Sequence, residues 1–345
     1  MHRNSIILTC PANNESINST IHRAIEVLDN NGMKVEYICM VGDAYSLPFI
    51  YAHIKQLGKE ICPTDNVYAD LDNDPFTIEI AIGRVIAKTL ADMSFYMERV
   101  FNYKDYLEIE KAPNPPNRAT IGNDWNNNGL TYCATAAEFA GEGDLYVNEQ
   151  LYEGDFNTQD DSPKGHTGYV TTTVSSELLT FDFARANFIL MDADHGNPYR
   201  IANFYGYELK PMHPGVFFAV SCSLGRIDLR GYGEEDTRYP DEEWGYKKAV
   251  AYCMMENGLN CYVGSLRTAW GTFSTIAHRE AAPGPCSFFV EELVHNDESV
   301  GKALMNAKNS LINEARNNVN KCTSWEYECF GDPAFNPYEP CNEGS

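Results

Sequence analysis

The sequence predicts an α/β fold of doubly wound, mostly parallel sheets in two adjacent subdomains. Short apolar runs alternate along the chain with amphipathic segments of helical period, which is the pattern of strand–helix–strand units. Three prolines within residues 111–117 (KAPNPPN) interrupt this alternation, because they cannot continue a helix and form a stiff connector. We therefore expect an amino-terminal subdomain over residues 1–112 and a second subdomain over residues 117–340.

The amino-terminal elements are indicated by apolar spacing and by one capping pattern. Residues 17–30 carry an apolar stripe of helical period. Residues 36–41 and 78–85 are short apolar runs of the kind that form buried strands. A capping-box pattern at residues 89–92 (TLAD) predicts a helix that starts there and ends near residue 106.

The second half repeats the alternation of strands and helices. Residues 141–165 interrupt it with seven carboxylates against one lysine and no clear period, which predicts a long surface loop; a calcium or substrate loop is the alternative. The strands expected here are residues 118–122, 187–191, 215–221 and 259–264, and the helices are residues 131–140, 246–256, 287–294 and 299–319.

Composition and charge narrow the range of functions. Of the 345 residues, 43% are hydrophobic and 22% are charged, which is typical of a globular protein. An apolar run of 18 residues is absent from the sequence, so we expect no transmembrane segment. The formal net charge of −23 repels nucleic acid and anionic lipid and favours cationic ligands, Ca²⁺ and basic peptides.

The cysteines and the amino terminus leave the cellular compartment open. The 11 cysteines are an odd number, so at least one thiol is free or pairs with another chain. Several lie in apolar stretches and are expected to be buried thiols, whereas Cys322, Cys329 and Cys341 lie near the polar carboxyl end, where a disulfide is possible. The apolar core of the amino terminus, residues 6–8, is too short for a signal peptide, so the protein either stays in the cell or is a piece of a longer precursor.

Two predicted strands end in residues that can carry chemistry. Residues 186–194 form an apolar run followed by His195 and Gly196, and residues 214–221 lead to Cys222. Sites in open α/β sheets form outside the carboxyl ends of strands. His195 and Cys222 are 27 residues apart, which suits two strands joined by one connection, with their ends side by side.

A histidine and a cysteine placed in this way favour nucleophilic catalysis. A nearby imidazole raises the thiolate fraction of a cysteine and can later protonate a leaving amine. The backbone N–H groups of Gly196 and Cys222 could then form an oxyanion hole. The alternative is an ordinary loop histidine at His195 and a buried thiol at Cys222.

These strand ends, together with four other segments, resemble the gingipain family of cysteine peptidases, which have a caspase-like fold. His-Gly after one strand and Cys after the next is the family's arrangement. The resemblance extends in order over about residues 36–335. The other matching segments are residues 37–48 (YICMVGDAYSLP), 65–84 (DNVYADLDNDPFTIEIAIGR), 261–271 (CYVGSLRTAWG) and 329–333 (CFGDP).

The resemblance implies a role for each matching residue. Cys222 would be the nucleophile, His195 the general acid/base, and Gly196 with Cys222 would hold the oxyanion. Trp270 sits where the family places an aromatic wall of the S1 pocket, with a core tryptophan as the alternative. The family's acidic partner of the histidine would be Asp124, which follows the strand that opens the second subdomain; Asp194 is a local alternative.

Substrate preference is less clear from the resemblance. Arginine-specific members carry an acidic S1 residue shortly after that strand, and residues 130–133 (LTYC) contain no carboxylate. Arg267, three residues before Trp270, could favour an acidic P1 residue instead. The family usually has a further strand–helix unit before Tyr37 and a following immunoglobulin-like domain, and the chain matches neither.

Metal binding is expected at one acidic turn. Asp70, Asp72 and Asp74 have the alternating spacing of oxygen ligands in calcium loops, although Pro75 and Ala81 exclude an EF-hand. Family members bind Ca²⁺, so the resemblance implies a structural ion here; a solvated acidic turn is the alternative. The chemistry requires no cofactor, and the lack of a Cys-x-x-Cys pattern argues against zinc.

We therefore predict a gingipain-like cysteine endopeptidase that acts on a peptide or protein substrate through Cys222 and His195. One rival hypothesis is a non-catalytic binding or scaffold protein on a caspase-like fold. Another is a transpeptidase that uses the same two residues and resolves the acyl-enzyme with an amine. The resemblance implies a secreted protein, while the sequence fixes neither the P1 residue nor the oligomeric state.

Overall fold

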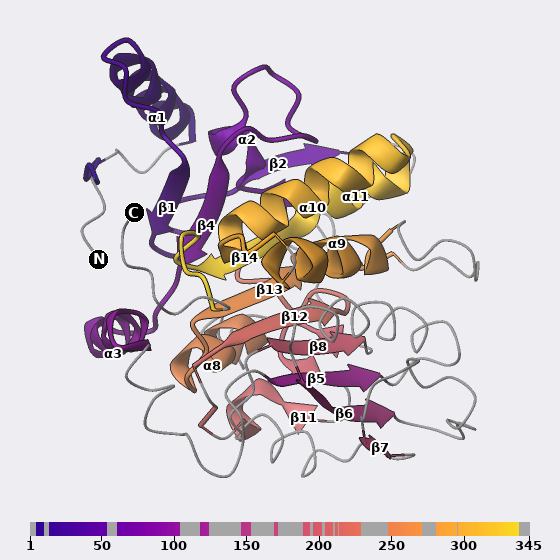
Figure 1. Ribbon diagram of the computed structural model, residues 1–345. Coiled ribbons are helices and arrows are strands. Elements are labelled where there is room, and N and C mark those ends of the chain that lie inside the picture. Colours follow the sequence, from indigo (N-terminus) through magenta and orange to yellow (C-terminus); the bar gives the residue numbers. More distant parts are fainter. Residues whose placement is uncertain are drawn as a thin grey trace.

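The fold is known from a computed structural model (Figure 1). The structure describes residues 5–9, 14–53, 61–103, 118–123, 146–152, 169–171, 189–193, 196–201, 204–209, 211–212, 214–228, 248–270, 281–294 and 296–337. Within these ranges, none of the helices combines the length and the apolar character needed to cross a bilayer.

Among the described residues, nine strands form one sheet (Figure 1). Their order is β1-β4-β14-β13-β12-β8-β5-β6-β7. All neighbours are parallel except β13 and β14, which pair antiparallel. The strands are β1 (Tyr37–Val41), β4 (Ala81–Val85), β5 (Arg118–Asn123), β6 (Tyr146–Tyr152), β7 (Tyr169–Thr171), β8 (Ile189–Ala193), β12 (Val216–Val220), β13 (Cys261–Ser265) and β14 (Tyr327–Gly331).

Two smaller sheets accompany the large one. The hairpin of β2 (Ile50–His53) and β3 (Ile61–Thr64) is antiparallel. The strands β9 (Gly196–Asn197), β10 (Arg200–Ile201) and β11 (Phe204–Tyr205) form a short three-stranded sheet directly after β8, followed by the 3-10 turn η2 (Gly206–Glu208).

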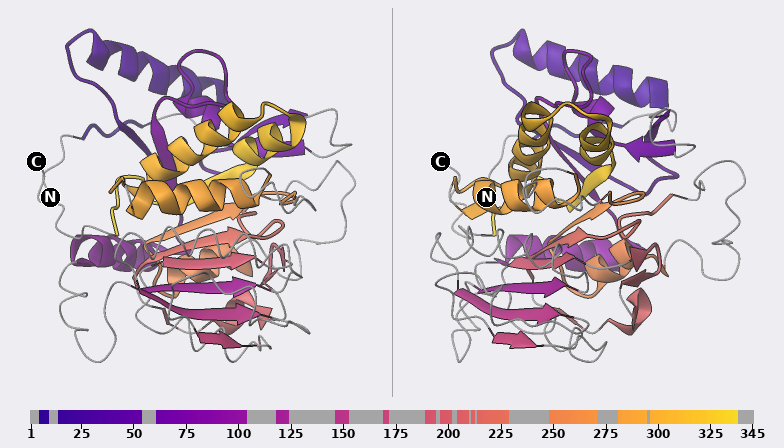
Figure 2. Two further views of the ribbon diagram at one scale, coloured as in Figure 1. Left: turned by 45° about the vertical axis from the view of Figure 1, so that its right-hand side comes forward. Right: turned by 90° about the vertical axis from the view of Figure 1, so that its right-hand side faces the viewer.

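Helices cover both faces of the large sheet. The helices are α1 (Asn14–Asp29), α2 (Asn66–Ala69), α3 (Leu90–Phe101), α8 (Val250–Glu256), α9 (Pro283–Val294), α10 (Val300–Glu314) and α11 (Asn318–Glu326). One core cluster joins Val216, Phe218 and Val220 of β12 to α9 and α10, and a second joins the alternate residues Phe217 and Ala219 to α8. Figure 2 shows α9 and α10 on one side of the sheet and α8 on the other. Because β12 is buried on both faces, its sequence is a continuous apolar run.

The structure confirms the predicted α/β class with a mostly parallel sheet. The strands expected at residues 36–41, 78–85 and 215–221 are present as β1, β4 and β12. Thr89 caps α3 by accepting a hydrogen bond from the amide of Asp92, as the capping pattern predicts. The division at residues 112/117 stays a prediction, although β14, from the end of the chain, lies in the sheet between β4 and β13.

Two predictions of local structure were wrong. The acidic segment 141–165, expected to be a surface loop, contains strand β6 beside β5, because pairing within the sheet overrides the polar composition. The single helix expected over residues 299–319 is two helices. α10 ends at Glu314, and the side chain of Asn317 caps α11 by accepting from the amide of Asn320, as an asparagine at an N-cap does.

A buried polar network ties β14 to the amino-terminal strands. The guanidinium of Arg84 donates to both oxygens of Asp65, at 2.8 and 2.6 Å, and both side chains are almost fully buried. Glu328 of β14 accepts hydrogen bonds from the Thr64 hydroxyl at 3.1 Å and from the Asp65 amide at 2.8 Å. Burial lowers the pKa of the neighbouring Lys308 ammonium, and the negative charges of Glu328 and Asp65 partly offset this effect.

We predict that this network makes stability depend on pH through Glu328. Burial raises the pKa of Glu328 from 4.5 to about 7. The folded protein then keeps a proton that the unfolded chain releases, so the free energy of unfolding falls as the pH rises through this window. Glu328→Gln keeps an oxygen acceptor for Thr64 and Asp65 but does not titrate, so we expect a smaller decrease in the free energy of unfolding between the two pH values. Urea unfolding at about pH 5 and about pH 7.5 measures this decrease.

The exposed carboxylate of Glu26 provides the control for this experiment. Glu26→Gln removes the same charge from the surface. In this variant, the free energy of unfolding should decrease with rising pH as much as it does in the wild-type protein. A Glu328→Gln variant whose stability follows the wild-type pH profile would contradict the prediction.

Candidate active site

Strand pairing brings the two predicted chemical segments to one edge of the sheet. β8 and β12 are parallel neighbours, and Ala193 at the end of β8 is opposite Val220 at the end of β12. Cys222 follows β12 by two residues, and Gly196 begins β9 three residues after β8. His195 and Asp194 lie between Ala193 and Gly196, outside the described residues.

The end of β5 lies at the same edge. Asn123, its last residue, is opposite Ala193 in the parallel pairing of β5 with β8. Asp124, the predicted partner of His195, is the next residue in the chain and lies outside the described residues. The backbone therefore brings the chain just before Asp124 and the chain just before His195 into register.

Gly196 packs directly against the turn that carries Cys222. A Cβ atom at this position would lie 2.7 Å from Leu224 Cγ and 3.1 Å from the Cys222 carbonyl oxygen. A side chain would therefore push the two segments apart, and glycine is needed for this close backbone approach. The residue next to His195 in the chain is thus in contact with the cysteine turn.

Cys222 lies on a firmly held turn. Its thiol is partly exposed and donates to the Ala269 carbonyl oxygen at 3.9 Å. The next residue, Ser223, is buried and has a φ of 58°, in the left-handed region. Its amide donates to the Arg267 carbonyl at 2.6 Å, and the amide of Gly225 donates to the Ser265 carbonyl at 2.8 Å. Strained residues held in this way are common at functional sites.

An internal ion pair fixes the segments around this turn. The Arg267 guanidinium donates to the two oxygens of Asp228 at 2.9 and 2.7 Å, and both side chains are almost fully buried. Arg267 Nε also donates to the Ile61 carbonyl of β3 at 3.0 Å, and the hydroxyl of Tyr51 in β2 donates to Asp228 at 3.0 Å. The pair therefore joins the Cys222 turn, the segment after β13 and the β2–β3 hairpin.

The buried position of Arg267 does not fit the role suggested from the sequence, in which its side chain would face the P1 residue of a substrate. The residue is 0% exposed and its positive charge is compensated by Asp228. The sequence pattern missed Asp228, because its only signal is an acidic residue six positions after Cys222, which has no known motif spacing. Arg267 is a structural ion-pair partner in this fold.

Trp270 ends the same segment, and its carbonyl accepts a hydrogen bond from the Ala282 amide at 2.9 Å. The indole is partly buried and packs against a small cluster of Cys62, Cys322 and Trp325. Its Nε1 is buried and has no hydrogen-bond partner among the described residues. The side chain thus combines an apolar ring with a donor that remains for another partner.

The acidic turn after α2 differs in detail from the sequence-based expectation. Oxygens of Asp70, Asp72 and Glu79 lie within 4.8 Å of one another. Asp74 instead pairs with Arg316 of the segment between α10 and α11. Glu79, which the alternating spacing did not include, therefore takes the place of Asp74 in the closest group of carboxylates.

Burial and mutual repulsion make this group unfavourable as three free anions. Burial raises the pKa of Asp70, and the charge of Asp72 adds to the effect. Burial also raises the pKa of Glu79, with further contributions from Asp72 and Asp70. The amides of Asp72 and Asp74 donate to Asp70 Oδ1 at 3.1 and 3.0 Å, which partly offsets the cost.

Comparison with known proteins gives one family and several similar structures. The family model described as Peptidase family C25 matches residues 11–338. The Arg-specific cysteine proteinase gingipain R (RgpB) is similar with a TM-score of 0.66 and 13% identity, covering 94% of this chain and 68% of that chain. The complex of Porphyromonas gingivalis RgpB pro- and mature domains gives 0.64 and 13%, covering 94% and 70%. A search of curated proteins found no match.

A third solved structure, described only as a protease, gives a TM-score of 0.64 at 14% identity and covers 94% of this chain and 70% of that chain. At identities this low, the likeness to all three structures shows a gingipain-like fold. The predicted roles of Cys222, His195, Asp124 and Gly196 remain predictions.

The ion pair around the Cys222 turn gives a prediction of stability. Asp228→Asn leaves the Arg267 guanidinium buried without its carboxylate, so we expect the free energy of unfolding to fall by about 3–5 kcal/mol. Replacing both residues, in Asp228→Asn with Arg267→Met, should cost clearly less than the sum of the two single changes. Urea unfolding of the four proteins measures the coupling.

The exposed pair of Lys302 and Glu36, at 3.1 Å, is the matched control. Glu36→Gln should change the free energy of unfolding by only about 0–1 kcal/mol, because a surface pair is screened by water. Additive effects of the Asp228 and Arg267 changes would show that the two side chains do not act together.

Proposed function

The chain belongs to peptidase family C25, and from this premise we propose that it hydrolyses peptide bonds through an acyl-enzyme formed on Cys222. Membership of the family implies a cysteine peptidase with a protein or peptide substrate. The proposal goes further and assigns the individual roles. Cys222 is the nucleophile, His195 the general acid/base, and Asp124 the group that orients the imidazole.

The reaction follows from these roles in two steps. The Cys222 thiolate attacks the carbonyl carbon of the scissile bond, and the amides of Gly196 and Cys222 stabilise the oxyanion that forms. His195 then protonates the leaving amine, which yields a thioester on Cys222. In the second step, His195 takes a proton from water, the hydroxide attacks the thioester, and the carboxylic acid product leaves with the thiol restored.

The contact of Gly196 with the Cys222 turn is the observation that carries the proposal. It supports a common cleft for the residues that follow β8 and β12, since the two segments touch where their strands end. The partial exposure of Cys222 supports access for a peptide. The hydrogen bonds of the turn support a fixed direction of attack, because Gly225 is bonded to the last residue of β13 and Ser223 to the segment after it.

We propose Trp270 as an apolar wall for the side chain that precedes the scissile bond. Its ring is partly exposed and belongs to the segment that the ion pair of Arg267 and Asp228 holds next to Cys222. The buried charge of Arg267 does not enter this pocket.

We also propose that Asp70, Asp72 and Glu79 hold a structural Ca²⁺. Oxygen ligands lie about 2.4 Å from calcium, so two ligands of one ion are at most about 4.8 Å apart. The oxygens of these three residues meet that limit. Burial, and to a smaller extent mutual repulsion, raises the pKa of Asp70 and Glu79, and a divalent cation would compensate both effects. The ion would support the turn and would take no part in catalysis.

Replacement of the nucleophile tests the proposed reaction. Cys222→Ala should reduce the rate of peptide cleavage by at least about 10⁴-fold while the circular dichroism spectrum stays unchanged, because only the attacking sulfur is lost. Cleavage is measured with a library of fluorogenic peptides. Analysis of the products by mass spectrometry, with an added amine, distinguishes hydrolysis from transpeptidation.

The exposed free thiol of Cys39 is the matched control. Cys39→Ala removes a sulfur far from the end of β12 and should leave the cleavage rate within about twofold of the wild type. Undiminished cleavage by Cys222→Ala would remove this residue from the mechanism and leave the family assignment intact.

Calcium binding is tested by its effect on thermal unfolding. Because the ion binds only the folded turn, saturating Ca²⁺ should raise the unfolding temperature, by an amount equivalent to about 2.7 kcal/mol at 100 times the dissociation constant. The variant with Asp70→Asn and Glu79→Gln should lose this response. The response should also weaken towards pH 4, where protons compete for the carboxylates.

Asp74→Asn separates the two possible sets of ligands. Because Asp74 pairs with Arg316, this variant should keep the calcium response at a somewhat lower overall stability. Loss of the response in Asp74→Asn, with the response kept in Glu79→Gln, would restore the set Asp70, Asp72 and Asp74 that the sequence spacing suggests.

A further inference from the structure

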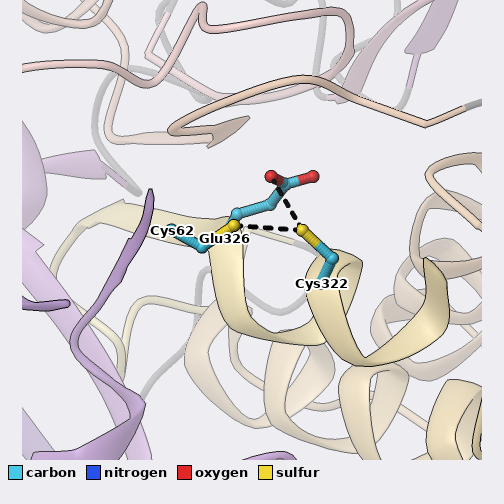
Figure 3. A group of neighbouring side chains, drawn as sticks. All are labelled: Cys62, Cys322 and Glu326. Carbon is cyan, nitrogen blue, oxygen red and sulfur yellow. Dashed lines mark hydrogen bonds between the residues drawn. The ribbon is translucent and has the colours of Figure 1, made fainter. Parts of the chain in front are cut away.

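Two buried thiols meet at a site separate from Cys222. Cys62 of β3 and Cys322 of α11 are each 0% exposed, and their sulfur atoms lie 3.1 Å apart although the two residues are 260 positions apart in the sequence (Figure 3). Glu326 lies one helical turn after Cys322, and its Oε2 accepts from the Cys322 thiol at 3.7 Å. The indole Nε1 of Trp325 donates to the Cys62 carbonyl at 2.8 Å.

We propose that Cys62 and Cys322 are a disulfide site that joins the β2–β3 hairpin to α11. The separation of 3.1 Å is shorter than the van der Waals contact of two sulfur atoms, so the two side chains already point at one another as a bond requires. Two thiolates bound at about 2.3 Å to one tetrahedral zinc would lie about 3.8 Å apart. The observed separation therefore favours the disulfide over a shared metal.

A second close pair of thiols shows why contact between sulfurs is not enough. Cys261 of β13 and Cys329 of β14 have sulfur atoms 3.5 Å apart. In the antiparallel ladder, however, Cys329 is opposite Val263, and Cys261 is opposite Gly331, so the two cysteines are diagonal neighbours. The Cβ atoms of diagonal neighbours are about 7 Å apart, whereas a disulfide needs about 3.5–4.5 Å. The ladder holds this pair open.

The Cys62–Cys322 pair has no such restraint. The strand β3 belongs to a separate two-stranded hairpin, and α11 meets it through side chains and the hydrogen bond from Trp325. A small shift of the helix against the hairpin can therefore close the gap between the sulfurs.

The bond forms by thiol–disulfide exchange with a small-molecule disulfide, such as oxidised glutathione, as oxidant. Because both thiols are buried, the exchange takes place when the β2–β3 hairpin and α11 open locally. The thiolate of one cysteine attacks the small disulfide, forms a mixed disulfide and releases one reduced thiol. The second cysteine then attacks the mixed disulfide and releases the other. The two hydrogens of Cys62 and Cys322 end on the two small thiols, and the two electrons reduce the oxidant. Glu326 accepts the proton of Cys322 in the first attack.

The location gives the bond a consequence for the candidate active site, and this step rests on the proposed function. Trp270 packs against the cluster that contains both sulfurs, and the carbonyl of Ile61, next to Cys62, accepts from Arg267. A disulfide here would fix the surface beneath Trp270 and the hairpin strand that Arg267 holds. It would restrain the substrate wall without altering Cys222.

Peptide mapping tests the bond without any assay of activity. The full chain is equilibrated with oxidised glutathione, its remaining thiols are alkylated under denaturing conditions, and the digest is analysed by mass spectrometry. We expect a cross-linked peptide pair containing Cys62 and Cys322 that disappears on reduction, and separately alkylated Cys261 and Cys329. Recovery of both Cys62 and Cys322 as alkylated monomers after oxidation would overturn the proposal, even if peptidase activity is present.

Thermal unfolding gives a second measurement. Oxidation should raise the unfolding temperature of the wild-type protein by about 5–10 °C, because the bond closes a long loop in the unfolded chain. The variant with Cys62→Ala and Cys322→Ala should lose this difference, while Cys261→Ala, equally buried, should keep it. One equivalent of metal in the purified protein that protects both thiols until a chelator is added would replace the disulfide with a metal site.

The role of Glu326 is tested by rate. Glu326→Gln should slow the formation of the cross-link about tenfold or more under the same oxidant, because the thiol loses its proton acceptor. The extent of cross-linking at equilibrium should remain close to that of the wild type. An unchanged rate would remove the carboxylate from the proposed step.

Discussion

The ion pair between Asp228 and Arg267 is the interaction on which the arrangement around Cys222 depends. Its two charges are buried, so each is costly without the other. The pair and its neighbours bond the cysteine turn, the segment that carries Trp270, and the β2–β3 hairpin. These segments come from distant parts of the sequence, and no ladder of the large sheet joins the hairpin to the other two. The buried pair therefore supplies a fixed geometry that strand pairing alone cannot.

The network of Arg84, Asp65 and Glu328 likewise fixes the position of segments that are distant in the sequence, here β4, β14 and the segment after β3. β14 runs antiparallel to β13 and parallel to β4, so it joins two blocks of strands with opposite directions. Glu328 of β14 binds the segment after β3, and Arg84 of β4 binds the same segment through Asp65. In this alignment all three buried side chains have partners, which favours the observed register of β14.

The sequence revealed local features and failed where the fold depends on distant partners. β4 and β12 could be predicted because strands buried on both faces are continuous apolar runs. β1 is also an apolar run, although it lies at the edge of the sheet and is only partly buried. The place of β14 between β4 and β13 could not, since strand order leaves no local trace. The same limit applies to Glu79, to Asp228 and to the meeting of Cys62 with Cys322, although Cys322 could be named as a disulfide candidate. Asn317 could have been recognised from the sequence as a helix-capping residue. The continuous apolar stripe of the expected long helix concealed this signal.

The order of the strands itself limits where a site can form. In the block β7-β6-β5-β8-β12-β13, the chain first builds outward from β5 through β6 to β7 and then returns to the other side of β5 with β8, β12 and β13. This order is 3-2-1-4-5-6, and the crevice of such a sheet opens between its first and fourth strands, here β5 and β8. Asp124 directly follows β5, His195 follows β8, and Cys222 follows the next strand, β12. The topology thus supports the proposed chemistry independently of the contact at Gly196, because β5, β8 and β12 are parallel neighbours whose carboxyl ends lie at one edge of the sheet.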